Sequence, residues 1–312
     1  MSVGTSDPFV WWNGAGGSAD GPSGGLCAAS EIRISPFDHG LLVGDGVFET
    51  VRVYGGQPFA WRRHLDRLEH SAAGLGLGLP TREELRTAAT AVLEANGLLD
   101  APAHHRHERA LSARFGACGR APPTLVVAAS EVVAGADATT VAISPWPRNR
   151  HGATAGSRPR RARRTCALAY AASSVPPRRS SNTQHQLCEA TGSSVVVVSD
   201  GVVRTPRRSR VACSASPALV LELGPSLGLR VEETPLPLRA LVDEADEAFL
   251  TSTVREVQGI AEIAGWGHKF DDALAPSPAP SPPPSTTSSP PTSTPRPDFS
   301  GLRHQTSHDL VC

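Results

Sequence analysis

The chain has 312 residues, enough for two modest domains with hydrophobic cores of their own. Its 30 basic and 30 acidic side chains balance, so the overall charge favours neither a nucleic-acid partner nor an acidic one. No apolar run approaches the roughly 20 residues of a membrane helix, and the N-terminal residues lack the basic and apolar regions of a signal peptide. We therefore expect a cytoplasmic protein that binds neither nucleic acid nor a membrane.

The first part of the chain predicts a hairpin followed by a helix. Val47–Tyr54 alternates as a strand does, and Gly55-Gly56 turns the chain back into Gln57–Ala60. Trp61–Gly74 then carries apolar residues at helical spacing, namely Leu65, Leu68 and Ala72.

A second helix is predicted over Arg82–Ala95. Thr81 and Glu84 form a capping-box pattern at its start, and Asn96-Gly97 ends it. Its apolar stripe consists of Leu85, Ala88, Ala89 and Val92. These elements predict a small α/β domain, which we place at residues 1–120.

Residues 121–268 predict a larger domain rich in strands. Apolar strands are expected at Thr124–Ala129, Thr140–Ser144 and Glu247–Thr251, a hairpin around Asp200-Gly201 and a buried helix over Pro217–Gly224. Residues 269–312 form a tail that is Pro/Ser/Thr-rich from Ala273 onward. Such a composition buries too little apolar area to offset the entropy of ordering, so we expect the tail to be disordered.

Three arginine-rich stretches between these blocks show no periodicity and predict no folded element: His104–Arg120, Ser157–Cys166 and Arg207–Ser216. A basic nucleic-acid-binding patch is one interpretation, but neither interleaved aromatic residues nor a basic helix face supports it. Three nearby histidines have no partner at metal-ligand spacing, and the six scattered cysteines contain no CxxC pair. We expect no metal site and free thiols.

Three motifs resemble the class IV (fold-type IV) aminotransferase family. They are Ser35–Leu77 (SPFDHGLLVGDGVFETVRVYGGQPFAWRRHLDRLEHSAAGLGL), Asn182–Val198 (NTQHQLCEATGSSVVVV) and Ala245–Val257 (ADEAFLTSTVREV). That family contains branched-chain and D-amino-acid transaminases and aminodeoxychorismate lyase. The resemblance implies pyridoxal 5'-phosphate as cofactor, a small amino substrate and a homodimer. It also implies a two-domain α/β (α+β) fold with a small α/β domain and a larger, mixed, β-barrel-like domain.

The resemblance assigns roles to four cofactor-binding residues. Arg67 in HLDRL matches the family's phosphate-binding arginine, and Ser252 and Thr253 in LTST match a turn that also holds the phosphate. Glu189 in CEATGS matches the glutamate that keeps the pyridine nitrogen protonated. Without the resemblance, Arg67 would pass for an exposed helix residue and Glu189 for a solvated loop residue.

Phe48, Glu49 and Thr50 match the strand that lines the family's substrate pocket from the small domain. Ordinary strand packing is the other interpretation of these three residues, and the sequence leaves both open. Asp38 and the neighbouring glycines are expected to shape the turn and helix start before this strand.

The lysine that forms the Schiff base is missing. Pro145–Gly156 (PWPRNRHGATAG) matches the family's approach to that lysine, yet Ser157-Arg158 stands where Leu-Lys is expected. Arg158 cannot replace it, because a guanidinium stays protonated and is a very poor nucleophile. The only lysine of the chain, Lys269, borders the tail and is expected to be exposed.

A shift of one base restores the missing motif. Codons for Ser157–Cys166, read one base out of register, can yield LKTTSCAENV, which supplies the lysine and resembles the family's TTSYAEN-like run. A similar shift restores family features in three other segments. His104–Arg120 yields the expected strand and loop, Pro177–Ser181 yields the EAVF strand, and Val211–Ala218 yields the GVTR phosphate-binding turn. We interpret this as compensated frameshifts that scramble residues 157–181 and 206–217, either as sequence errors or as lesions in a decaying gene.

The motifs around Gly44–Phe59 and Asn182–Ser193 most resemble aminodeoxychorismate lyase. A branched-chain or D-amino-acid transaminase is the alternative, and it shares nearly all of the cofactor residues. The third interpretation is a non-enzyme, either a dead paralogue or a misfolded frameshift product. With Arg158 at the lysine position, we expect this polypeptide to be inactive.

Overall fold

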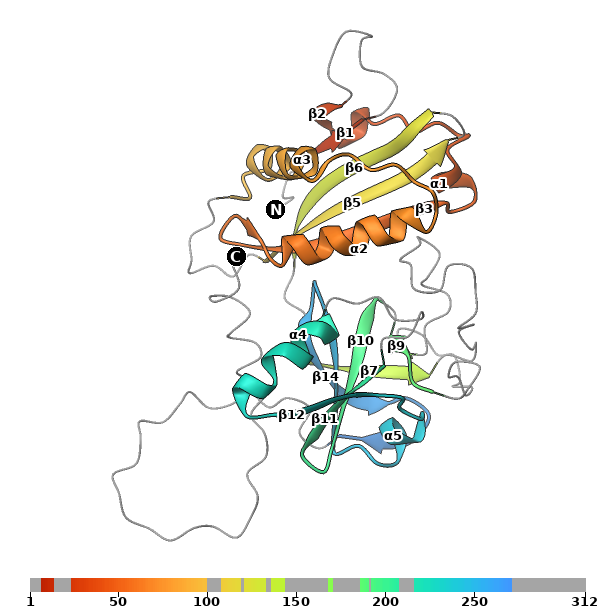
Figure 1. Ribbon diagram of the computed structural model, residues 1–312, viewed down its shortest axis with the longest axis vertical. Coiled ribbons are helices and arrows are strands. Elements are labelled where there is room, and N and C mark those ends of the chain that lie inside the picture. The colour runs from red at the N-terminus through yellow and green to blue at the C-terminus, as the bar shows by residue number, and fades with distance from the viewer. Residues whose placement is uncertain are drawn as a thin grey trace, which may run out of the picture.

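The structure is a computed structural model. It describes residues 7–13, 24–99, 108–118, 121–132, 136–143, 168–170, 186–190, 192–207 and 216–270. These residues form two bodies, each built around its own sheet, with the N-terminal body above the C-terminal one in Figure 1. The lysine position Arg158 and most of the segments interpreted as frameshifted lie outside the described residues.

The N-terminal sheet has the strand order β2-β1-β6-β5-β3-β4. Its strands are β1 (Phe9–Trp12), β2 (Gly25–Ala28), β3 (Gly46–Tyr54), β4 (Gln57–Pro58), β5 (Glu108–Cys118) and β6 (Ala121–Val132). The β3–β4 hairpin confirms the one predicted from the glycine pair. The expectation that Thr124–Ala129 belongs to the second domain is wrong, because β6 pairs with β5 and β1. The first sheet therefore extends to Val132, past the boundary expected at residue 120.

The expectation of no folded element at His104–Arg120 is also wrong. β5 lies between β3 and β6 and pairs with both of them along its length. A sheet ladder joins backbone N–H and C=O groups, which every residue except proline provides. Two neighbouring strands therefore hold this segment in place despite its unfavourable composition.

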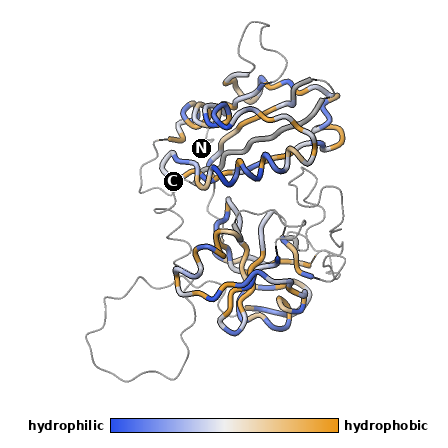
Figure 2. The backbone as a smooth tube through the Cα atoms, in the orientation of Figure 1, coloured by the Kyte–Doolittle hydropathy of each residue, from blue (hydrophilic) through white to orange (hydrophobic). Residues whose placement is uncertain are grey.

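Two helices pack on this sheet, α2 (Trp61–Ala73) and α3 (Arg82–Ala95), and both match their predicted ranges within one residue (Figure 1). The predicted apolar stripes are buried, with Leu68 and Val92 packed against Val47 and Val51 of β3 in one cluster. Hydrophilic residues cover the outward side of both helices (Figure 2). A short helix, α1 (His39–Leu42), begins after Asp38, whose side chain accepts a hydrogen bond from the N–H of Leu41. This agrees with the expectation that Asp38 shapes a helix start.

The C-terminal body contains a ring of strands. The path runs through β10, β13, β14, β7, β8 and β9, and β9 pairs with β10 again, which closes the ring. The members are β7 (Ala138–Ile143), β8 (Leu168–Tyr170), β9 (Glu189–Ala190), β10 (Ser193–Ser199), β13 (Glu247–Ser252) and β14 (Glu256–Ile263). One apolar cluster, including Val195, Leu250 and Ile260, fills this domain. The closure confirms the β-barrel-like architecture.

A second apolar layer covers the opposite face of the same strands. β11 (Val202–Pro206) and β12 (Arg230–Thr234) extend the sheet beyond β10, and α4 (Ser216–Leu223) packs on it beside β12. Val196, Phe249 and Val220 of α4 share this cluster. The valines of β10 alternate between the two clusters, as strand geometry requires. The remaining short elements are η1 (Ala29–Glu31), η3 (Pro225–Leu227) and α5 (Arg239–Val242).

The folded chain continues slightly beyond the boundary expected at residue 269. β15 (His268–Lys269) pairs with β14, and Phe270 is buried in the core of the C-terminal domain. The rest of the predicted tail lies outside the described residues. Among the described helices, none combines the length and the apolar character that crossing a membrane requires.

Candidate functional site

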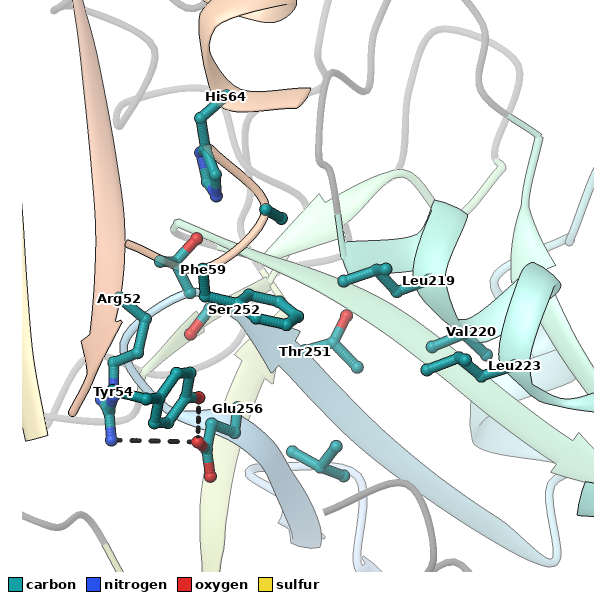
Figure 3. A pocket seen from close by; sticks show the side chains of 13 residues that line it. Arg52, Tyr54, Phe59, His64, Leu219, Val220, Leu223, Thr251, Ser252 and Glu256 are labelled. Carbon is teal, nitrogen blue, oxygen red and sulfur yellow. Dashed lines mark hydrogen bonds and ion pairs between the residues drawn. The ribbon is translucent and has the colours of Figure 1, made fainter. Parts of the chain in front are cut away.

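A cavity lies where the two domains meet (Figure 3). The N-terminal domain contributes residues of β3, of the segment between β4 and α2, and of the first turn of α2, including Arg52, Tyr54 and His64. The C-terminal domain contributes α4 and the turn between β13 and β14. The α4 side chains Leu219, Val220 and Leu223 form an apolar wall, and Phe59 lies across from them on the side of Arg52, Tyr54 and Glu256. Two of the predicted phosphate-binding residues, Ser252 and Thr253, line this cavity.

The β13–β14 turn carries the hydroxyl groups of the site. Ser252 is the last residue of β13 and pairs in register with Glu256, so residues 253–255 form the loop between them. The Ser252 hydroxyl oxygen accepts a hydrogen bond from the N–H of Arg255 at 3.1 Å. A hydroxyl that accepts in this way still has its own proton to donate, which suits an anionic ligand oxygen.

Glu189 lies on the sheet that forms the floor of the cavity. It pairs in register with Ser194 of β10, which in turn pairs with Thr251 of β13. Directly paired residues point to the same face of a sheet and adjacent strands are about 4.8 Å apart, so these three side chains form one row about 10 Å long. Thr251 lines the cavity, and the row therefore connects Glu189 to it.

Two hydroxyl groups in this row have no hydrogen-bond partner in the described part of the chain. They are Oγ of Ser194 and Oγ1 of Thr251, and both residues are buried. Buried polar atoms are nearly always satisfied in native proteins, so an unsatisfied pair calls for an explanation. A polar ligand that reaches between β10 and β13 would satisfy both groups.

Arg67 lies in a buried cluster within the N-terminal domain. Its Nε donates to Oε1 of Glu49 at 2.6 Å and its Nη2 donates to Oε2, while His64 Nδ1 lies 2.9 Å from Oε2. Arg67 is one helical turn after His64, and His64 lines the interdomain cavity. Arg67 is not among the described residues that line this cavity, so the structure does not bring it together with Ser252 and Thr253; its Nη2 lies 3.2 Å from Nδ1 of His64, which does line the cavity.

The three predicted substrate-pocket residues divide between the two faces of β3. Glu49 shares the face of Val47, Val51 and Val53, which packs on α2. Strand alternation places Phe48 and Thr50 on the other face, together with Arg52 and Tyr54. Arg52 and Tyr54 of this second face line the cavity, whereas Glu49 lies on the face that packs on α2, so strand alternation separates Glu49 from Phe48 and Thr50.

Sequence inspection missed Arg52, Tyr54 and Glu256. Arg52 donates from Nη1 to the carbonyl oxygen of Val254 at 2.5 Å, and the Tyr54 hydroxyl donates to Oε1 of Glu256. Both bonds join the two domains, and Figure 3 shows the one between Tyr54 and Glu256. The available signal was the placement of Arg52 and Tyr54 at alternate positions of β3, but their partners are about 200 residues away in the chain.

The residues present fit one part of a pyridoxal phosphate site. The hydroxyl groups of the β13–β14 turn suit the phosphate. Glu189, with the unsatisfied hydroxyls of Ser194 and Thr251 beside it, suits the polar edge of the pyridine ring. The covalent attachment does not fit: Lys269 is exposed in β15 and pairs with Glu262, a position away from the cavity lining. Among the described residues no group of three or more His, Cys, Asp or Glu could hold a metal ion.

Comparisons with known proteins agree with this geometry. Residues 46–263 match the family model described as amino-transferase class IV. A Methanocaldococcus jannaschii protein provisionally named a branched-chain-amino-acid aminotransferase is 30% identical over 243 residues, 75% of this chain and 84% of its own. D-alanine aminotransferase of Listeria monocytogenes is 26% identical, covering 77% of this chain and 86% of its own.

Two further comparisons bear on reaction and fold. Aminodeoxychorismate lyase of Bacillus subtilis is 39% identical over 74 residues, which is 23% of this chain and 25% of its own. A solved branched-chain amino acid aminotransferase, complexed with N-(5'-phosphopyridoxyl)-L-glutamate, superposes with a TM-score of 0.67 at 22% identity. That superposition covers 86% of this chain and 90% of the other. The chain therefore belongs to the class IV aminotransferases, a family of pyridoxal-phosphate enzymes, and has their two-domain fold.

Proposed function

We propose that the intact reading frame specifies an aminodeoxychorismate lyase, which converts 4-amino-4-deoxychorismate to 4-aminobenzoate and pyruvate. The support is the motif resemblance around β3 and Glu189, together with the 39% identity to the lyase of Bacillus subtilis. A branched-chain or D-amino-acid transaminase is the second candidate. The far longer matches to the two aminotransferases favour that candidate.

We also propose that the polypeptide with this sequence is catalytically inactive. The observation that carries this proposal is the position of the lysine. The site has hydroxyl groups suited to a phosphate and the row that contains Glu189, but the only lysine of the chain, Lys269, is exposed beside the end of β14. A dead paralogue and a misfolded frameshift product both remain consistent with it. The alternative is that the frameshifts are errors in the sequence, in which case the gene encodes a working enzyme with the lysine in place.

The chain's own residues have definable tasks in this proposal. When bound, pyridoxal phosphate supplies an electron-accepting ring. Glu189 would hold a proton at the pyridine nitrogen, while the Ser252 and Thr253 hydroxyls would donate to phosphate oxygens. Arg67 would place its guanidinium near the same phosphate, in the orientation that Glu49 sets. Phe48 and Thr50 would line the substrate side from β3.

The first test is the DNA sequence across codons 100–270. A continuous frame that restores the lysine and the GVTR turn would show that the locus encodes a working enzyme. Confirmed shifts would mean that it encodes an inactive remnant.

The second test compares two purified proteins, the chain as written and a frame-restored version with Lys in place of Arg158. With added cofactor, the chain as written is expected to show no aldimine absorbance and no adduct after borohydride reduction, because it has no amine at the site. The frame-restored protein is expected to show both signals. A borohydride-trapped adduct at any residue of the chain as written would contradict the proposal of inactivity.

The frame-restored protein also separates the two reactions. Release of pyruvate from 4-amino-4-deoxychorismate without any amino acceptor would support the lyase. Transfer of the amino group from branched-chain or D-amino acids to a keto acid, without pyruvate release, would support the transaminase.

We further propose a homodimer in the cytoplasm. The exposed apolar residues Phe37, Leu41, Leu42 and Val43 at α1 support the dimer, because contiguous exposed apolar patches mark interaction sites. A second copy of this chain is the proposed occupant of that surface.

A further inference from the structure

Arg52 is an arginine in an unusual place. It lies on β3 of the N-terminal domain, its side chain is 1% exposed, and it faces the C-terminal domain. Its Nη1 donates to the carbonyl oxygen of Val254 at 2.5 Å, across 202 residues of sequence. A guanidinium is rarely buried unless its neighbours hold it, so this contact is a built feature of the domain interface.

Tyr54 provides a second link from the same face of β3. Its hydroxyl donates to Oε1 of Glu256, and the same carboxylate oxygen lies 4.0 Å from Nη2 of Arg52. The Arg52 guanidinium carbon also lies 5.7 Å from the centre of the Tyr54 ring, a cation–π distance. Two neighbouring side chains of one domain therefore hold both ends of a short segment of the other, Val254–Glu256.

That segment is not held by its own backbone preferences. Glu256 has a φ of +55°, a conformation that side chains with a Cβ rarely adopt. Val254 and Arg255 are exposed. The turn thus combines an unfavourable backbone with an exposed loop, and contacts from the N-terminal domain stabilise it.

The contacts also fix one peptide plane. The Val254 carbonyl accepts from Arg52, and the N–H of the next residue, Arg255, donates to Oγ of Ser252 at 3.1 Å. Both polar groups of the Val254–Arg255 peptide bond are therefore engaged in opposite directions. The Arg255 N–H occupies one lone pair of the Ser252 hydroxyl oxygen, so the proton of that hydroxyl must point in another direction.

We propose that Arg52 is a positioning residue, which orients the Ser252 hydroxyl from the other domain and thereby makes the β13–β14 turn competent to bind a phosphate monoester. This inference rests on the proposed phosphate-binding role of Ser252 and Thr253. Docking of the N-terminal domain and phosphate binding are coupled through a single guanidinium. Loss of Arg52 leaves Ser252 and Thr253 in the chain but not in the arrangement that binds phosphate.

The test uses full-length variants Arg52→Met and Arg52→Lys, with Arg62→Met as the matched control. Arg62 is an exposed arginine on α2, outside the cavity lining. The first readout is hydrogen exchange of the backbone amides of residues 253–257. Arg52→Met is expected to speed exchange at Arg255 by about tenfold or more, since hydrogen bonds to charged groups contribute that much or more. Arg52→Lys keeps one donor, so its exchange rate at Arg255 should lie between those of Arg52→Met and the unmodified chain. Arg62→Met should exchange at the rate of the unmodified chain.

The second readout compares the affinities of pyridoxal 5'-phosphate and of pyridoxal, which lacks the phosphate. Arg52→Met is expected to reduce the preference for the phosphorylated form at least about fivefold, with pyridoxal affinity unchanged. A general loss of structure would weaken both ligands alike. Partial recovery of the preference in Arg52→Lys would support a positioning role.

The outcomes separate the two proposals. Unchanged exchange at residues 253–257 in folded Arg52→Met overturns the positioning role, whatever the ligands do. An equal change in affinity for both ligands overturns it as well. If the unmodified chain binds both ligands equally, the phosphate-binding role of the turn is wrong, while the exchange result still decides whether Arg52 holds the turn. If Arg52→Met does not fold, Arg52→Lys, which keeps the positive charge but loses the planar set of donors, replaces it in both readouts.

Discussion

At the scale of single residues, Arg67 and Glu49 show how one side chain prepares another. Glu49 is 3% exposed, and both of its oxygens accept hydrogen bonds from Arg67. Two bonds to a planar guanidinium fix its orientation, which one bond to a lysine would not do. The arginine that the resemblance assigns to phosphate is therefore held in one orientation by the carboxylate of Glu49 on β3.

Thr81 offers a prediction about stability and pH. The pKa of Glu84 lies below its ordinary value because its carboxylate accepts hydrogen bonds from the Thr81 hydroxyl and then from the Thr81 N–H. A group with a lowered pKa stabilises the fold above its ordinary pKa, and this contribution is lost as pH falls through the lowered value. Thr81→Ala should lower the free energy of unfolding by about 1 kcal/mol at neutral pH and by less in acid.

Urea unfolding at pH 7 and under acidic conditions measures both quantities. Thr87→Ala, at an exposed position of the same helix, is the control and should show no such pH dependence. An equal loss at both pH values for Thr81→Ala would show that the bond from the Thr81 hydroxyl to the Glu84 carboxylate does not contribute to the cap.

At the scale of elements, local signals in the sequence were sufficient wherever neighbours in the chain determine the structure. Thr81 with Glu84 marked the start of α3, and Asn96-Gly97 marked its end. β5 was missed because its own composition argues against a strand, and only its pairing with β3 and β6 makes it one. Arg52 was missed for the same kind of reason, since the Val254 carbonyl that gives it a role is 202 residues away.

Leu68 tests the packing of α2 on the N-terminal sheet. It is fully buried between α2 and β3, and truncation would leave a cavity in a core that cannot collapse easily. Leu68→Ala should lower the free energy of unfolding by about 2–5 kcal/mol. His70→Ala, an exposed change on the same helix, should stay within about 0.5 kcal/mol. Chemical denaturation gives both values, and a small effect at Leu68 would show that the N-terminal core does not form as described.

At the scale of the whole molecule, the two domains are joined by contacts of unequal strength. Arg63 of α2 donates to Glu222 of α4 at 2.6 and 2.9 Å, but both side chains are partly exposed. Such surface pairs contribute about 0–1 kcal/mol. The buried Arg52 and Tyr54 contacts on the other side of the cavity are therefore expected to contribute more to holding the domains together.

The proposed dimer makes a prediction at this scale too. Leu41→Glu combined with Leu42→Glu places two charges in the exposed apolar surface at α1 and should convert a dimer to a monomer, because burying those charges is unfavourable. Light scattering during gel filtration measures the mass. Trp266→Gln changes an exposed apolar residue elsewhere and should leave the mass unchanged. A monomeric unmodified chain would contradict the proposal.

The Arg52–Val254 bond also has a consequence in time. A ribosome adds about 5–20 residues per second, so Val254 is made about 10–40 s after Arg52, which lies 202 residues earlier. During that interval the N-terminal domain can complete its own core, before Val254 and Glu256, which Arg52 and Tyr54 contact in the other domain, have been made. Completion of the candidate site therefore comes late in synthesis, and a chain terminated before Val254 would lack the β13–β14 side of the cavity.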